Sequence, residues 1–164
     1  KKNITMLIRA FARSEPRRHG YKLIFAGGGS FNKEELKKIE HLRMNNYINQ
    51  VNVNDAELWY LYRNAGAILA PSLGEGFNLP LVEGLAANVP IICSDIPVHR
   101  EVADSFATLI NPMQNEDWAD ILRDPTTLKK PSNILGEELY KEKCNYFSRE
   151  RMVNEHIKAY KRLA

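Results

Sequence analysis

Apolar residues near the start of the chain follow two spacings. Four of them recur at the i, i+3, i+4, i+7 interval of an amphipathic helix: Ile4, Leu7, Ile8 and Phe11. Pro16 and Gly20 end this pattern. Residues 21–26 then form a short apolar run that predicts a largely buried strand, and Gly27-Gly28-Gly29 follow it.

The same alternation continues along the chain. Further short strands are predicted at 48–53, 66–70, 91–93 and 108–110, and helices at 32–42, 55–62, 80–87, 98–103, 118–122 and 134–164, the last with a break near Ser148. Asn32 with Glu35 has the spacing of a capping box, with Leu36 on the apolar face of the helix, and Asp55 is expected to cap the next helix. Residues 123–133 are expected to be the most flexible connection.

Short apolar strands that alternate with helices indicate a parallel sheet covered on both faces. Because crossovers between parallel strands are right-handed, we expect an α/β fold with a doubly wound, Rossmann-like sheet, in one domain spanning residues 1–164. Helices over 134–164 are expected to close this domain. Ligands of such sheets bind at the carboxyl ends of the strands, which here lead into the loops 27–32, 52–56, 71–80, 94–97 and 111–114.

Composition argues against a disordered, a collagen-like and a coiled-coil protein. The 164 residues are 44% apolar and 26% charged, near the average of globular domains, with a formal net charge of +3. This charge is too small to predict a nucleic-acid partner, although basic residues gather in positions 1–22, where a solvated face, a diphosphate crevice or an anionic membrane surface are alternative interpretations. No apolar run is long enough to span a bilayer and no signal peptide opens the chain, so a cytoplasmic location is expected.

The cysteines and histidines predict no metal site. Cys93 and Cys144 form no Cys-x-x-Cys pair, and Cys93 is expected to be inert core. We expect all four histidines to be ordinary surface or edge residues without metal spacing: His19, His41, His99 and His156. Trp59 and Tyr62 are expected to pack in the core or against another domain. No cofactor is expected.

The segment 71–83 carries the richest chemistry. Gly74 and Gly76 let the backbone approach a ligand, and Pro80 marks the start of a helix whose free N–H groups can hold a phosphate. Glu75 precedes this helix and Glu83 lies about one turn inside it, so both carboxylates could accept bonds from sugar or ribose hydroxyls. The alternative is that Glu75 is a solvated loop acid and Glu83 a helix-surface residue.

The run Glu75-Gly76-Phe77-Asn78-Leu79-Pro80-Leu81-Val82-Glu83 resembles the Glu, seven residues, Glu signature of retaining glycosyltransferases with the GT-B fold, especially family 4. Lys2-Asn3, the segments 23–29, 58–72 and 90–97, and Arg100-Glu101-Val102 resemble further motifs of that family's C-terminal domain in the same order. The resemblance covers roughly residues 2–122. It implies that this chain is one half of a GT-B fold, the half that holds the nucleotide-sugar donor.

The resemblance also implies roles for single residues. Glu75 would be the catalytic residue, binding hydroxyls of the transferred sugar, and Glu83 would bind the ribose. Lys2 would contact the diphosphate and offset the charge on the leaving group. The remaining donor-binding positions implied by the match are Gly28 in the glycine turn, Val53 beside the base, and Gly76, Phe77, Asn78 and Leu79 along the sugar and diphosphate. The family needs no metal for catalysis.

Two departures from the family pattern change the expectation. Asn78 stands where the family usually has glycine, which puts a side chain beside the donor. The family's first strand with its arginine, and its acceptor domain, would lie before residue 1, so we expect this chain alone to be inactive. The expected partners are therefore a UDP- or GDP-linked sugar and a saccharide or lipid-linked acceptor, with peripheral membrane association of the full-length protein.

The resemblance predicts sugar transfer to an acceptor hydroxyl, in surface polysaccharide synthesis. Two alternatives remain at this stage: a GT-B-like epimerase or phosphorylase, and a non-catalytic carbohydrate-binding or regulatory module, which Asn78 favours. A dinucleotide-dependent dehydrogenase fits poorly, because Gly27-Gly28-Gly29-Ser30-Phe31-Asn32 matches Gly-x-Gly-x-x-Gly only at its start. A Ser72–His99 hydrolase lacks the glycine-flanked nucleophile elbow.

Overall fold

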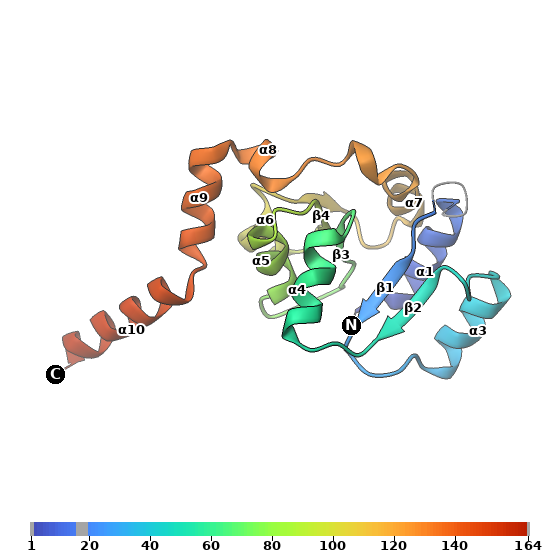
Figure 1. Cartoon of the computed structure of the whole chain (residues 1–164), viewed down its shortest axis with the longest axis horizontal. Coiled ribbons are helices and arrows are strands. Elements are labelled where there is room, and N and C mark those ends of the chain that lie inside the picture. Colours follow the sequence, from blue (N-terminus) through green and yellow to red (C-terminus); the bar gives the residue numbers. More distant parts are fainter. Residues whose placement is uncertain (1, 16–19, 164) are drawn as a thin grey trace.

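The computed structural model describes residues 2–15 and 20–163, and it alternates strands and helices as predicted (Figure 1). The five strands in this part of the chain are short: β1 (Leu23–Ala26), β2 (Ile48–Val51), β3 (Ile68–Ala70), β4 (Ile91–Ser94) and β5 (Thr108–Ile110). Each lies within or close to the range expected from its apolar run. The α/β class with parallel, Rossmann-like sheets is confirmed.

Helices of the described residues pack on these sheets, and at β4 they cover both faces. They are α1 (Ile4–Arg13), α3 (Lys33–His41), α4 (Asp55–Asn64), α5 (Leu79–Ala86), α6 (Pro97–Ala103), α7 (Asn115–Arg123), α8 (Pro131–Leu135), α9 (Glu137–Tyr146) and α10 (Arg149–Leu163). Pro16, expected to end the first helix, lies outside the described residues; α1 itself ends at Arg13. The connection 123–133 holds the short 3-10 helix η1 (Pro125–Thr127) and the start of α8.

Two helix starts test the capping predictions. The capping box at α3 is confirmed: Asn32 accepts bonds from the Glu34 and Glu35 backbone N–H groups, and Glu35 accepts from the Asn32 N–H. The prediction that Asp55 caps α4 is wrong. Asn54 is the cap, because Glu57 three residues later completes a second box with it and leaves Asp55 in the first turn.

The strands form two parallel sheets where a continuous one was expected. β1 pairs with β2 in one sheet, and β3, β4 and β5 pair in that order in the other (Figure 1). Among the described residues no strand pairs with the second edge of β1 or of β3. Within each sheet the parallel direction still places the carboxyl ends of neighbouring strands at one edge.

The buried core lies on both faces of β4. Ile92 belongs to one apolar cluster, built mainly from α1, β1 and α7, whereas Ile91 and Cys93 belong to a second cluster with α5 and α6. All four residues of β4 are buried, as expected for the middle strand of a parallel sheet covered by helices. Cys93 is 0% exposed, which confirms its prediction as a core residue.

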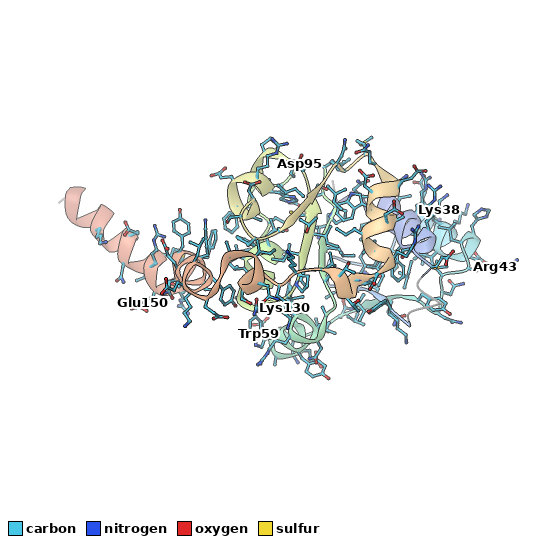
Figure 2. All side chains as sticks on the ribbon, turned by 90° about the horizontal axis from the view of Figure 1, so that it is seen from above. Lys38, Arg43, Trp59, Asp95, Lys130 and Glu150 are labelled. Atoms are coloured by element: carbon cyan, nitrogen blue, oxygen red, sulfur yellow. The ribbon has the colours of Figure 1, made fainter. Side chains whose placement is uncertain are left out.

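One predicted packing position is corrected, and for Trp59 one of its two expected positions, the core, is excluded while packing against another domain stays a prediction. Leu36, expected on the apolar face of α3, is 53% exposed, while Ile39 on the same helix is buried. Trp59 lies at the outside of α4 (Figure 2) and is 41% exposed, so it is not a core residue. Only Tyr62 of the predicted aromatic pair on this helix is buried, because α4 turns that face toward the neighbouring helix α5.

Helix α5 sits directly on the second sheet through Gly84. A Cβ at this position would lie 2.9 Å from Ile91 Cγ1 and 3.2 Å from Ile68 Cγ1, closer than side chains pack. Glycine therefore sets the distance between α5 and the strands β3 and β4. The C-terminal helices follow: Tyr140 of α9 donates to the Leu85 carbonyl at 3.1 Å, and α10 extends away from the rest of the chain (Figures 1 and 2).

Replacing Gly84 by alanine should lower the free energy of unfolding by about 1–3 kcal/mol, because the added methyl group meets a side chain that is itself buried. Urea unfolding followed by circular dichroism measures this. Gly66→Ala is the matched control, since a Cβ there meets its nearest atoms at an ordinary 3.8 Å. Equal stability of the two variants would contradict the close packing of α5.

The Cys93 thiol should resist alkylation in the folded protein. Burial, and to a smaller extent the nearby negative charge of Asp95, together raise its pKa to about 12. At pH 8 only about one such thiol in ten thousand is the reactive thiolate. Treatment with iodoacetamide and peptide mass spectrometry should find Cys93 modified only after unfolding, whereas Cys144, which is half-buried, is modified in the native protein. Rapid native labelling of Cys93 would contradict its burial.

Candidate functional site

The loop that joins β3 to α5 forms the centre of the candidate site. It leaves the sheet at Pro71 and reaches Asn78, which precedes α5 in a left-handed conformation with φ 72° and ψ 73°. The Asn78 side chain does not cap the helix, and Pro80 occupies its first turn as predicted. The N-terminus of α5 thus keeps its positive dipole end toward the surface, where Phe77 and Leu79 are 42% and 64% exposed.

Glu75 is an exposed loop residue whose carboxylate accepts a hydrogen bond from a buried side chain. Ser72, 4% exposed, donates its hydroxyl to Glu75 Oε1 at 2.6 Å. A bond from a buried donor restricts the rotamers of an otherwise free acidic side chain. Glu75 is therefore an exposed acid with one oxygen bonded to a buried side chain of the fold, and whether it binds a sugar stays a prediction.

Glu83 is held by a different partner. It lies half-buried on α5, and Tyr62 of α4 donates its phenol to Glu83 Oε2 at 2.6 Å. Burial raises the pKa of Tyr62 above its ordinary value, and the bond to Glu83 and the negative charge of Glu83 raise it further. The phenol consequently stays a donor throughout the neutral range. The bond fixes one Glu83 oxygen; that both acids face one ligand stays a prediction.

The glycine turn after β1 brings two predicted residues together. Gly27, Gly28 and Gly29 all have positive φ, at 71°, 81° and 79°. The Lys2 ammonium lies 3.6 Å from the position that a Cβ on Gly28 would take, so the ammonium stands against the turn although the two residues are far apart in sequence. A cation beside an open glycine turn suits an anionic ligand.

Gln50 of β2 braces this glycine turn. Its Oε1 accepts from the Phe31 N–H at 3.0 Å, and its Nε2 donates to the Gly29 carbonyl. Val53, predicted beside the base, follows β2 and is half-buried, and Gly76 is exposed in the loop before α5. The residues predicted to bind a donor thus lie on the loops after β1, β2 and β3, on α5 in the case of Leu79 and Glu83, and before α1 in the case of Lys2.

His99 contradicts its prediction as a surface or edge residue. It is 0% exposed on α6, with Nδ1 2.8 Å from the Ser94 carbonyl oxygen and Nε2 2.8 Å from Asn78 Nδ2. The contact is tertiary, so spacing along the chain does not reveal it. The signal was Asn78 itself, because a side chain in place of glycine at a left-handed position needs a partner. His41 is exposed as predicted. His19 and the side chain of His156 lie outside the described residues.

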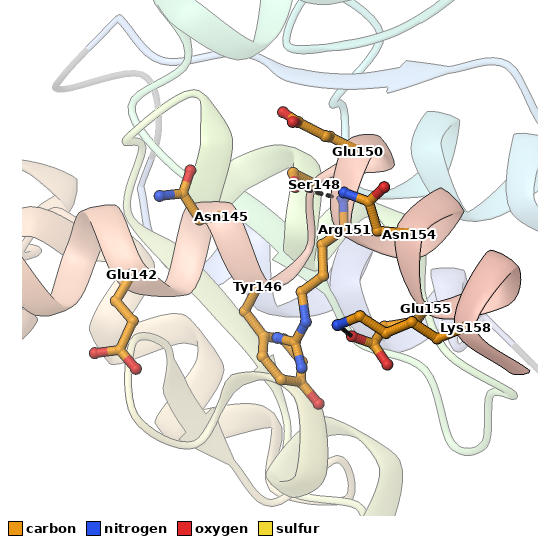
Figure 3. Close-up of a pocket in the computed structure, with 9 residues that line it drawn as sticks. All are labelled: Glu142, Asn145, Tyr146, Ser148, Glu150, Arg151, Asn154, Glu155 and Lys158. Carbon is orange, nitrogen blue, oxygen red and sulfur yellow. Dashed lines mark hydrogen bonds and ion pairs between the residues drawn. The ribbon is translucent and has the colours of Figure 1, made fainter.

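A separate cavity lies between α9 and α10 and contains none of the predicted site residues (Figure 3). Its lining is polar. The Arg151 guanidinium stands 3.7 Å above the Tyr146 ring, and Lys158 pairs with Glu155 at 3.0 Å. Toward the loop, the Phe147 ring packs edge-on against Phe77 at 6.2 Å between centroids. The end of α9 therefore contacts the candidate site from outside.

Metal and membrane features were searched in the part of the chain that the structure describes. It holds no group of three or more His, Cys, Asp or Glu side chains able to bind a metal ion. None of its helices combines the length and apolar character that crossing a bilayer requires.

Comparison with known proteins decides the family. A model of the family described as "Glycosyl transferases group 1" matches residues 1–142, which include every predicted site residue. The chain belongs to the glycosyl transferases group 1 family. The resemblance to a GT-B, family 4 glycosyltransferase domain is thereby confirmed at the level of family and fold.

Individual relatives agree with this family assignment. The chain is 34% identical over 94 residues to the O-antigen chain mannosyltransferase RfbU of Salmonella typhimurium, covering 55% of this chain and 26% of RfbU. Its fold matches a sucrose-phosphate synthase from Thermosynechococcus elongatus with a TM-score of 0.76 at 19% identity, covering 99% of this chain and 42% of that protein. It also matches Anabaena Alr3699/HepE in complex with UDP and glucose, with a TM-score of 0.74 at 16% identity, covering 94% of this chain and 44% of that one. The chain thus spans about a quarter of RfbU and less than half of these two structures.

Substituting Tyr62 by phenylalanine should cost about 1.5 kcal/mol of stability, since it removes a hydrogen bond to a charged, half-buried acceptor. Tyr60→Phe is the matched control on the same helix, because Tyr60 is 67% exposed and should change stability by less than about 0.5 kcal/mol. Chemical unfolding of both variants measures the difference. A Tyr62→Phe protein as stable as Tyr60→Phe would show that the phenol does not hold Glu83.

Proposed function

We propose that this chain is the donor-binding part of an enzyme that moves a hexosyl group from a nucleoside-diphosphate sugar to an acceptor hydroxyl, with retention of configuration. The observation that carries the proposal is the arrangement around α5. In a chain of the group 1 family, Glu75 and Glu83 are each held by a hydroxyl donor on either side of a helix N-terminus that its own preceding side chain does not cap.

Each group has a role in the proposed reaction. Lys2 beside the glycine turn and the N–H groups at the start of α5 would bind the diphosphate and stabilise its charge as it leaves with the bonding electrons. Glu75 would bind hydroxyls of the transferred sugar near the reacting carbon, while Glu83 would bind the ribose. Val53 would lie against the base. The acceptor hydroxyl would attack on the face from which the diphosphate departs, and its proton would pass to the departing diphosphate oxygen. No metal ion is required.

The relatives support a choice of donor to test first. RfbU is named a mannosyltransferase of the O-antigen chain, which supports a mannosyl group and surface polysaccharide synthesis. The Anabaena structure holds UDP and glucose, which supports a nucleotide-linked donor. GDP-mannose and UDP-glucose are therefore the first donors to compare. The acceptor, the cytoplasmic location and the membrane association expected from the sequence stay predictions.

The arrangement of Asn78 weakens the alternative of a non-catalytic module. That alternative drew on an asparagine beside the donor, but the Asn78 amide is bonded to a buried imidazole within the domain. The epimerase or phosphorylase alternative predicts turnover without an acceptor. Incubating the full-length protein with donor alone and with donor plus phosphate separates these reactions from transfer.

In the full-length protein, Glu75→Gln should lower the transfer rate by about a hundredfold or more while nucleotide affinity changes less than about threefold, because the charge acts on the reacting sugar. Glu83→Gln should instead weaken nucleotide binding by about tenfold. Product formation and calorimetric titration with GDP and UDP measure the two effects.

Glu40→Gln is the control for this pair, an exposed glutamate on α3 that should change neither quantity. The proposal fails if the wild-type protein binds neither nucleotide at millimolar concentration. It fails equally if Glu75→Gln retains full transfer activity.

A further inference from the structure

The backbone at Asn78 holds a conformation that most residues disfavour. Its φ of 72° lies in the left-handed region, which glycine enters freely and asparagine tolerates best among the other residues. This residue joins the loop that carries Glu75 to the first turn of α5. Any change of its φ would turn the loop relative to the helix N-terminus, so the site needs a constraint that keeps Asn78 in place.

The chain supplies that constraint from α6. A carbonyl oxygen only accepts hydrogen bonds, so His99 Nδ1, 2.8 Å from the Ser94 oxygen, carries the proton. An amide nitrogen only donates, so His99 Nε2 accepts from Asn78 Nδ2 at 2.8 Å. Both contacts are satisfied by one neutral tautomer of a fully buried ring. The imidazole thus ties the loop after β3 to the carboxyl end of β4.

We propose that His99 is a positioning residue for the donor site. By holding the Asn78 amide, it keeps the backbone before α5 in its left-handed turn and so fixes the direction of the N–H groups that meet the diphosphate. A glycine at position 78 would reach the left-handed conformation because it lacks a Cβ. Asparagine is held in the same conformation by its hydrogen bond to His99. This inference rests on the proposed function for its ligand, and the pairing itself rests on the geometry above.

The proposal predicts a specific rescue pattern in the full-length protein. His99→Leu leaves the Asn78 amide without its partner and should raise the Kd for GDP or UDP, whichever the wild type binds, by about tenfold. Asn78→Gly needs no partner to reach a positive φ, and its own measured Kd is the reference for the double variant. In the double variant Asn78→Gly/His99→Leu the effect of leucine should disappear, giving the affinity of Asn78→Gly alone.

Two further variants keep the test decisive. Asn78→Ala retains His99 but removes the amide and should lose about as much affinity as His99→Leu; it replaces that variant if His99→Leu fails to fold. Val102→Ala truncates a buried residue of the same helix that belongs to the apolar cluster. It should lower stability while leaving nucleotide affinity within about threefold, which separates positioning from general destabilisation.

The outcomes distinguish failure of the positioning role of His99 from failure of the proposed function. Unchanged affinity in His99→Leu and Asn78→Ala would overturn the positioning role, as would an equal tenfold loss on adding His99→Leu to Asn78→Gly. If the wild type binds neither nucleotide, the proposed function fails. Unfolding of the wild type, His99→Leu, Asn78→Gly and the double variant then still tests the hydrogen-bonded pair Asn78–His99. Additive effects on the unfolding equilibrium constant would then overturn it, and non-additivity of about tenfold would support it.

Discussion

Parallel strand pairing is the constraint on which the site depends. Because β3, β4 and β5 run in the same direction, the loops that leave β3 and β4 emerge at one edge of their sheet. That is why Asn78, which follows β3, can bond to His99, whose ring also bonds to the Ser94 carbonyl at the end of β4. An antiparallel partner would have placed one of these loops at the opposite end. At the carboxyl end of β1, the Lys2 ammonium lies against the glycine turn.

The exposed groups of the site are held by less exposed ones. Ser72 holds Glu75, Tyr62 holds Glu83, and Gln50 holds the turn at Gly29. An acidic side chain in water samples several rotamers and loses that freedom when a ligand binds. A hydrogen-bond donor anchored in the fold restricts the acidic side chain before the ligand binds, and so removes part of this entropic cost. The precision of the site therefore resides in residues that need not touch the ligand.

Local patterns predicted most of the elements, and tertiary contacts explain the rest. The Asn32 cap, the short buried strands and the helix start at Pro80 each depend on neighbours a few residues away, so the sequence alone specifies them. Asn54 and Glu57 also have the spacing of a box, but asparagine and aspartate cap helices about equally well, so local sequence does not separate Asn54 from Asp55 as the cap. His99 could not be placed, since its burial depends on how α6 lies against the loop before α5. The division into two sheets likewise depends on pairing between distant segments.

The unpaired edges of β1 and β3 have a consequence for the continuity of the two sheets. Each edge presents backbone N–H and C=O groups that, among the described residues, no neighbouring strand takes up. An edge of this kind is a template on which a further extended segment can pair. One strand lying between β1 and β3 would join the two parallel sheets into one.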